Sequence, residues 1–217
     1  MRPRLVVATG NRGKLAEFAA LLLDPEIGGG ASCDLISLAD AGDVVLPPEG
    51  DEYEPNAIAK ARSAALALGL PALADDSGLE VAGLDGAPGP LSARYGGPGL
   101  DDAGRVRHLL AELAGRGPAD RSAQFVCVAV LAFPDGAVEV ARAVCPGRIA
   151  EAPAGAGGFG YDPIFEVQAD GVPPGTTMAE LPAERKQALS HRGRAVRLLA
   201  PALARLAGGQ PSAAKRS

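Results

Sequence analysis

Two adjacent carboxylates are the residues best suited to chemistry in this chain. Asp75 and Asp76 follow the apolar run at residues 70–74, which predicts a short buried strand ending at the pair. Side chains alternate along a strand, so one carboxylate should orient the loop while the other faces a cleft. Gly78 is expected to free the turn that follows. Carboxylate oxygens suit Mg²⁺, which keeps positions open for phosphate oxygens and water. The alternative is a strand-to-loop turn in which an aspartate acts as a local cap.

A second candidate site lies near the N-terminus, between an apolar run at residues 5–8 and a helical pattern at Leu15, Phe18 and Leu22. Such a strand–loop–helix unit offers backbone N–H groups and a helix N-terminus to an anion. The residues of this loop are Thr9, Gly10, Asn11, Arg12, Gly13 and Lys14. The spacing matches neither the Walker A loop nor GxGxxG, so phosphate binding and a plain connection both remain open.

A second glycine-rich loop, at residues 155–165, carries Phe159, Tyr161 and Phe165. These are three of the eight Phe and Tyr side chains in the chain. Aromatic side chains on such a loop could cover a base, or they could form core packing beneath it.

Cationic residues gather where the last helical region begins, at Lys186, His191, Arg192 and Arg194. Positive charge at a helix start opposes the helix dipole, which indicates an anionic partner from elsewhere. A break near Ser190 would weaken this argument, because it would separate two helices.

The elements that must position these residues alternate between strands and helices. A strand is expected at 33–38, irregular chain at 40–51, and a helix at 57–68 that Gly69 ends. Lys60, inside that helix, is expected to be a solvated lysine. An ordered functional loop is expected at 80–98, then a helix capped by Asp101 or Asp102, and a hairpin at 123–145. Residues 28–30 should form a flexible loop and 207–217 a disordered tail.

Composition limits the class of protein. The 217 residues are enough for one large domain or two small lobes, and the contents of 47% hydrophobic and 22% charged residues are those of a globular protein with a sizeable core. The net charge of −5 argues against general nucleic-acid binding. Three widely spaced cysteines without a CxxC pattern argue against zinc and favour a reducing cytoplasm. We expect no export signal and no membrane span.

Four segments together resemble the family of non-canonical purine nucleoside triphosphate pyrophosphatases, which act on dITP, XTP and ITP. They are residues 8–14 (ATGNRGK), 74–79 (ADDSGL), 158–165 (GFGYDPIF) and 190–193 (SHRG), and residues 86–89 and 92–95 also look like the family. The resemblance runs from about residue 5 to 205. It implies an α/β fold, with an elongated mixed central sheet flanked by helices and two lobes with an active-site cleft between them. We therefore expect a single two-lobed domain over residues 1–206.

The resemblance also implies the reaction and the residues that perform it. The reaction is Mg²⁺-dependent hydrolysis between the α- and β-phosphates by a homodimer. Asp76 would be the general base and metal-associated carboxylate, Ser77 would touch substrate, and the loop from Thr9 to Lys14 would hold the triphosphate. The remaining nucleotide contacts would come from Phe159, Gly160, Tyr161, Asp162, Lys186, His191 and Arg192, with the last three completing the pocket and reading the purine 6-keto group.

Proline stands in this sequence where the family usually has glutamate. The corresponding segments are Pro47-Pro48-Glu49-Gly50 and Glu54-Pro55-Asn56-Ala57. Glu49 and Glu54 are the candidates for a replacement metal ligand. Two alternatives to the leading function remain: a Maf-type pyrophosphatase, which shares the general fold and acts on other modified nucleotides, and, because of the proline changes, a weakly active nucleotide-binding module. Pyrophosphate release from ITP with Mg²⁺ would separate them.

Overall fold

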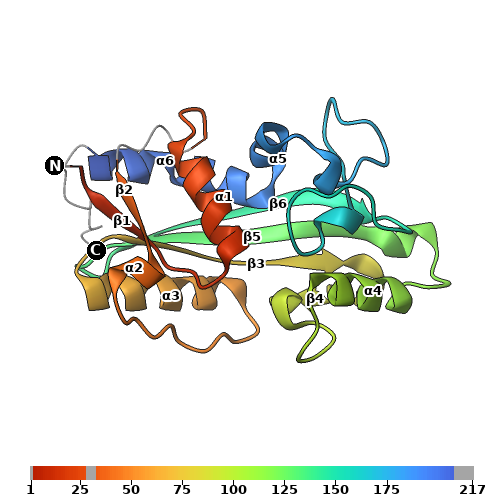
Figure 1. Cartoon of the computed structure of the whole chain (residues 1–217), viewed down its shortest axis with the longest axis horizontal. Coiled ribbons are helices and arrows are strands. Elements are labelled where there is room, and N and C mark those ends of the chain that lie inside the picture. Colours follow the sequence, from red (N-terminus) through yellow and green to blue (C-terminus); the bar gives the residue numbers. More distant parts are fainter. Residues whose placement is uncertain (1, 28–32, 208–217) are drawn as a thin grey trace, which may run out of the picture. The chain divides into compact units, whose positions relative to one another are not determined.

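The computed structural model describes residues 2–27 and 33–207 and contains both strands and helices (Figure 1). The predicted flexible loop at 28–30 lies outside the described residues. Helix α6 extends to Ala207, and the rest of the predicted tail, residues 208–217, also lies outside them. The helices are α1 (Arg12–Leu23), α2 (Leu38–Ala41), α3 (Tyr53–Leu68), α4 (Asp102–Glu112), α5 (Ala183–Leu189) and α6 (His191–Ala207).

Seven strands formed by the described residues make one mixed sheet in the order β2-β1-β3-β5-β6-β7, with β4 paired to β3. Strand β1 is parallel to both β2 and β3, whereas β4 is antiparallel to β3 and β7 is antiparallel to β6. This confirms the predicted mixed α/β class, with helices flanking the sheet. The strands are β1 (Arg4–Val7), β2 (Asp34–Ser37), β3 (Ala72–Val81), β4 (Pro88–Gly89), β5 (Ser122–Ala132), β6 (Val138–Ile149) and β7 (Phe165–Val167).

Strand β3 is longer than the sequence suggested. It runs ten residues, so Asp75 and Asp76 lie inside the strand, and the predicted strand end and turn at this point are wrong. Gly78 serves close packing instead of a turn, because a Cβ there would come within 2.0 Å of the Gly89 carbonyl oxygen. The prediction failed because the partners of β3 lie elsewhere in the chain: β5 is its neighbour in the sheet, and β4 pairs with Leu79 and Glu80 at its far end.

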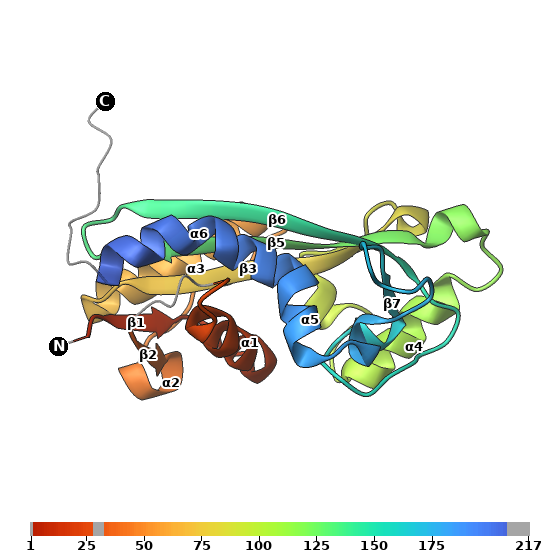
Figure 2. The same ribbon diagram turned by 90° about the horizontal axis from the view of Figure 1, so that it is seen from above.

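The described chain divides into two compact units. The first comprises residues within 1–76, 127–143 and 192–217, and the second comprises 77–126 and 144–191. In the first unit, α1 and α6 cover one face of the strands and α3 covers the other (Figures 1 and 2). The core beneath α1 and α6 joins Phe18 and Leu22 of α1 to Val196 and Leu199 of α6 through strand residues such as Leu73. This packing anchors α1 and α6 on the Asp75 face of β3.

The second unit has its own core. Leu79 of β3, Leu109 of α4, Phe125 of β5 and Phe165 of β7 pack together with Tyr161 from the second glycine-rich loop. Helix α4 begins at the predicted cap, because the Asp101 side chain accepts a hydrogen bond from the Gly104 N–H at 2.7 Å. The loop residues around Tyr161 are therefore held by the same core that positions α4.

Candidate active site

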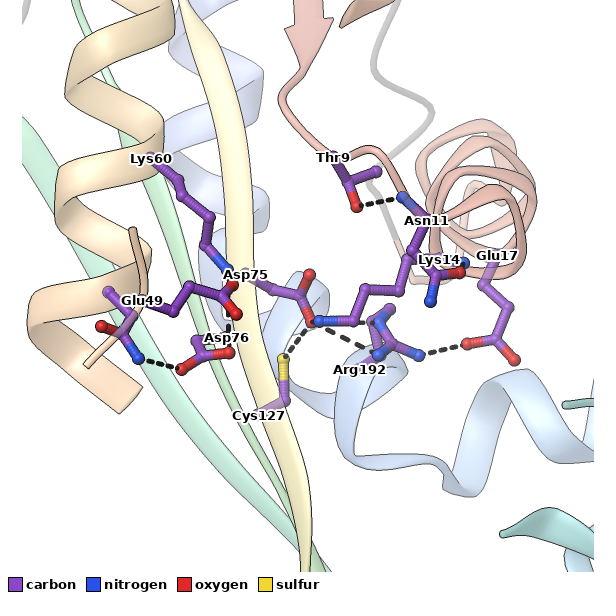
Figure 3. Close-up of polar contacts among 11 residues, drawn as sticks. Thr9, Asn11, Lys14, Glu17, Glu49, Lys60, Asp75, Asp76, Cys127 and Arg192 are labelled. Atoms are coloured by element: carbon purple, nitrogen blue, oxygen red, sulfur yellow. Dashed lines mark hydrogen bonds and ion pairs between the residues drawn. The ribbon is translucent and has the colours of Figure 1, made fainter. Parts of the chain in front are cut away.

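Asp75 is the centre of a buried charge network on one face of β3. Its Oδ2 lies 3.2 Å from Lys14 Nζ of α1 and 3.3 Å from Arg192 Nη2 of α6 (Figure 3). Arg192 also forms an ion pair with Glu17 of α1 and lies over the Phe18 ring. Asp75 thus ties the two helices to the strand.

Asp76 faces the opposite side of the strand, toward α3, as the alternation of side chains predicted (Figure 3). Its Oδ2 accepts a hydrogen bond from Asn56 Nδ2 at 2.8 Å, and its Oδ1 lies 3.7 Å from Lys60 Nζ. Lys60 also forms an ion pair with Glu49. The prediction of a solvated Lys60 is wrong: the residue is only 6% exposed, because it contacts carboxylates supplied by β3 and by the segment before α3.

Asn56 links this carboxylate to the segment that precedes α3. Its Oδ1 accepts from the Gly50 N–H at 2.7 Å, and its Nδ2 donates to the Gly50 carbonyl at 3.0 Å. The same amide therefore fixes the backbone beside Glu49 and the position of Asp76. Glu54, the other candidate ligand, is exposed on α3.

The two aspartates differ in how their charge is balanced. Burial raises the pKa of Asp76, and the opposing effects of Lys60, the Asn56 hydrogen bond and Lys14 do not cancel it. Burial acts to lower the pKa of Arg192, but Asp75 and Glu17 outweigh it and the pKa is raised. Asp75 therefore belongs to a strongly ionic structural pair, whereas Asp76 is a carboxylate with a tendency to take up a proton. A general base needs the second property.

The loop between β1 and α1 is shaped by its own side chains. Thr9 Oγ1 accepts a hydrogen bond from the Asn11 N–H at 3.2 Å, and Asn11 Oδ1 accepts from the Lys14 N–H at 3.1 Å as the N-cap of α1. Arg12 and Gly13 form the first turn of the helix. A Cβ at Gly10 would meet no atom within 4 Å, so the backbone there is open to an approaching group.

The second unit holds another set of predicted site residues. Lys186 Nζ lies 2.6 Å from Asp162 Oδ2 and 5.4 Å from the centre of the Phe159 ring. Asp162 Oδ2 also accepts from the Phe159 N–H at 2.8 Å. Gly158 has φ of +74°, and a Cβ there would come within 2.0 Å of that carboxylate, so the compact turn requires glycine.

The aromatic residues of this loop have different environments. Phe159 is half-buried, whereas Tyr161 and Phe165 are buried in the core. His191 is also buried, and its ring stacks on Phe125 with centroids 4.7 Å apart. The core-packing alternative is confirmed for Tyr161 and Phe165, whereas Phe159 is the one of the three aromatic side chains that remains partly accessible.

The structure brings most of the predicted residues into two sets, one in each unit. Lys14, Asp75, Asp76 and Arg192 belong to the first unit, and Phe159, Asp162, Lys186 and His191 belong to the second. Ser77, half-buried on β3, begins the second unit. Sequence reasoning assigned no function to Glu17 or Asn56 and wrongly placed Lys60 in solvent. The positions of these three residues within α1 and α3 did not indicate the buried partners that they contact, which come from other parts of the chain.

A mixed α/β fold with paired buried carboxylates beside a strand–loop–helix turn defines a protein suited to binding phosphorylated ligands. The model of the Ham1 family matches residues 5–202. The dITP/XTP pyrophosphatase of Mycolicibacterium paratuberculosis is 49% identical, and the match covers 94% of this chain and 97% of that protein. The chain belongs to the Ham1 family, which confirms the resemblance in the sequence.

Other relatives agree with this membership. The dITP/XTP pyrophosphatase of Deinococcus deserti is 48% identical, over 90% of this chain and 87% of that protein. The structure of a HAM1 protein from Coxiella burnetii has a TM-score of 0.76 and 41% identity, with coverage of 93% and 98%. Among the described residues, no helix is long and apolar enough to cross a membrane.

Proposed function

We propose that this protein hydrolyses non-canonical purine nucleoside triphosphates, dITP, ITP and XTP, to the monophosphate and pyrophosphate. The observation that carries the proposal is Asp76, a buried carboxylate with a raised pKa, held between Asn56 and Lys60 in a chain whose relatives are named dITP/XTP pyrophosphatases. Membership of the Ham1 family favours this function over that of a Maf-type enzyme.

The chemistry assigned to the first unit is attack of water on the α-phosphorus. Asp76 takes a proton from the water, a bond forms between the water oxygen and the α-phosphorus, and the bond to the bridging oxygen breaks to release pyrophosphate. The open backbone at Gly10, the start of α1 and the Lys14 ammonium are suited to the charge of the triphosphate. Ser77 is assigned a contact with substrate.

We assign recognition of the base to the set in the second unit. The half-buried Phe159 ring offers a stacking surface, with contributions from the loop residues Gly160, Tyr161 and Asp162, and the Lys186 ammonium is a donor suited to a 6-keto oxygen. A donor in that position would face the amino group of adenine, so ATP should be a poor substrate. We also assign His191 and Arg192 to substrate binding: His191 is buried against Phe125 in this unit, and Arg192 is buried against Asp75 in the first unit.

The residues around Asp76 fit a divalent cation. Asp76 and Glu49 supply two carboxylates that meet at the Lys60 ammonium, and burial raises the pKa of Asp76 despite the opposing effect of Lys60. Among the described residues, no group of three or more His, Cys, Asp or Glu side chains could hold a metal. Mg²⁺ accepts this small donor set, because it retains water and binds substrate phosphates. When bound, Mg²⁺ would neutralise phosphate charge and favour deprotonation of the attacking water.

Glu49→Gln should weaken binding of Mg²⁺, since it removes one of the two carboxylates that meet at Lys60. We expect the concentration of Mg²⁺ that gives half-maximal activity to rise about tenfold, a typical effect of losing a metal-supporting group. Calorimetric titration of the substrate-free protein with Mn²⁺ measures the same change without turnover. Glu54→Gln, at an exposed position of α3, is the matched control. Equal effects of the two variants would remove Glu49 from the site.

Lys14→Met should raise the KM for ITP about tenfold or more, because it removes a cation from the proposed triphosphate site while keeping an unbranched side chain. Lys14 also contacts Asp75, so thermal denaturation of the variant must be followed alongside the kinetics. Arg62→Met, a change at an exposed position of α3, is the control for a general loss of charge. An unchanged KM in a folded Lys14→Met protein would argue against the loop as a phosphate site.

Pyrophosphate release from a panel of nucleoside triphosphates, with Mg²⁺ and with EDTA, tests the function as a whole. We expect release from ITP, dITP and XTP that is abolished by EDTA, and little release from ATP and GTP. Equal rates on ITP and ATP would overturn the specificity, and binding without release would favour a nucleotide-binding module.

We also propose a cytoplasmic homodimer. The three cysteines are buried thiols, which suits a reducing compartment, and light scattering would test the oligomeric state.

A further inference from the structure

Ser92 is a buried polar residue for which the proposed function gives no role. It lies in the segment after β4, where its Oγ accepts a hydrogen bond from the Leu79 N–H of β3 at 2.8 Å and donates to the Gly89 carbonyl at 2.7 Å. The residue is only 8% exposed. Its hydroxyl therefore joins the strand that carries the aspartates, three residues beyond Asp76, to the turn that follows β4.

The backbone around Ser92 is packed directly against β3. Leu79 pairs with Gly89 in the antiparallel ladder. A Cβ on Gly78 would lie 2.0 Å from the Gly89 carbonyl oxygen and 2.8 Å from Ser92 Oγ. There is thus no room for a side chain between the strand and this segment, and the position of Ser92 is set by contacts with the β3 backbone.

The other side of Ser92 contacts the second glycine-rich loop. Tyr161 Oη donates a hydrogen bond to the Ser92 carbonyl at 3.1 Å. Tyr161 is 5% exposed, and burial raises the pKa of its hydroxyl, so it remains a donor at neutral pH. Tyr161 follows Phe159 and precedes Asp162, whose carboxylate accepts from the Phe159 N–H and pairs with Lys186. The hydrogen bond of Tyr161 therefore restrains the turn that carries Phe159 and Asp162, the partner of Lys186 on α5.

We propose that Ser92 is a positioning residue that couples strand β3 to the base-recognition loop through the Tyr161 hydroxyl. The two hydrogen bonds of Ser92 Oγ fix the backbone of Ser92, and the Ser92 carbonyl in turn fixes the loop by accepting from Tyr161. This inference rests on the proposed function for its kinetic consequence, but the coupling is a property of the second unit alone and can be measured without substrate.

The test compares Ser92→Ala, Tyr161→Phe and the double variant, with Tyr95→Phe as the matched control. Tyr95 donates its hydroxyl hydrogen bond to Glu112 on α4 and not to Ser92, so this control removes one tyrosine hydroxyl from the same region without touching the proposed connection. Hydrogen–deuterium exchange of the substrate-free proteins is followed in peptides spanning residues 155–165. We expect faster exchange there in Ser92→Ala and Tyr161→Phe and no change in Tyr95→Phe.

The kinetic test uses the ratio of kcat/KM for ITP to that for ATP. Each of the two variants should lower this ratio about fivefold, through KM for ITP with kcat within about twofold, as expected for loss of one hydrogen bond. The double variant should lose less than the product of the single losses, because both bonds act along one connection. Thermal denaturation identifies variants that fail to fold.

Two outcomes would overturn the inference. The first is hydrogen–deuterium exchange at 155–165 in Ser92→Ala and Tyr161→Phe that is no faster than in Tyr95→Phe. The second is a loss of the kcat/KM ratio in the double variant that equals the product of the two single losses. If the wild-type protein releases no pyrophosphate from ITP, the proposed function fails, whereas the exchange measurement still decides whether Ser92 and Tyr161 position the loop.

Discussion

Asp76→Asn is expected to release pyrophosphate from ITP at least about 100-fold more slowly than the wild type while remaining fully folded. The substitution keeps the shape of the side chain and an oxygen that can accept from Asn56 Nδ2, but it removes the proton acceptor. Loss of a positioned general base typically costs a factor of about 10² to 10⁴ in rate. Single-turnover pyrophosphate release, with the variant saturated by Mg²⁺ and ITP, measures the chemical step separately from binding.

The same variant should be as stable as the wild type or more stable in metal-free buffer at neutral pH. Burial is the largest influence on Asp76, and the pKa is raised in the folded protein, so folding favours the neutral form. The contribution of Asp76 to stability is present below its unfolded pKa and is lost as the pH rises through the folded pKa. The advantage of Asp76→Asn in Tm should therefore shrink as the pH is lowered from 8 toward 4.

These two measurements separate a base from a structural carboxylate. A rate within about tenfold of the wild type would remove Asp76 from the role of general base. A Tm that falls at neutral pH would indicate that the ion pair with Lys60, at 3.7 Å, outweighs the cost of burial.

Asp75→Asn should have the opposite effect on stability: we expect the free energy of unfolding to fall strongly. Arg192 is 3% exposed and Asp75 is 2% exposed, so the variant leaves a buried guanidinium without one of its two carboxylates. Removing one partner of a buried pair typically costs about 3 kcal/mol or more. For a chain of this size the loss corresponds to a Tm lower by roughly 6 to 12 °C. Urea denaturation and calorimetry give the two values.

Glu17→Gln is the control for this prediction. Glu17 is the more exposed partner, with 19% of its side chain accessible, and Asp75 remains beside Arg192 in the variant. Its stability loss should be clearly smaller than that of Asp75→Asn. Equal losses would mean that the network acts through Glu17 and the anchoring of α1, and the central role of Asp75 would be wrong.

Periodicity identified the principal elements of the fold. The apolar run at residues 5–8 and the spacing of Leu15, Phe18 and Leu22 corresponded to β1 and α1, and the strand pattern at 123–133 corresponded to β5. Gly69 ends α3 with φ of +61°, as a C-terminal glycine should. These features are local, so a single sequence contains the information that determines them.

The contacts that define the candidate site are not local. Lys60 was expected in solvent because its neighbours in α3 gave no sign of Asp76 or Glu49, which lie sixteen residues after it and eleven before it. Strand β3 was expected to end early because its partners β5 and β4 lie elsewhere in the chain. The alternation that separates Asp75 from Asp76 could be predicted, but the partners on each face required the arrangement of α1, α3 and α6.

The Lys60 ammonium, placed between Glu49 and Asp76, also bears on how the first unit folds. The chain supplies its own counterion for this pair of acids, so the buried end of α3 can pack on β3 without a metal ion to neutralise them. Folding of this region should therefore be insensitive to chelators.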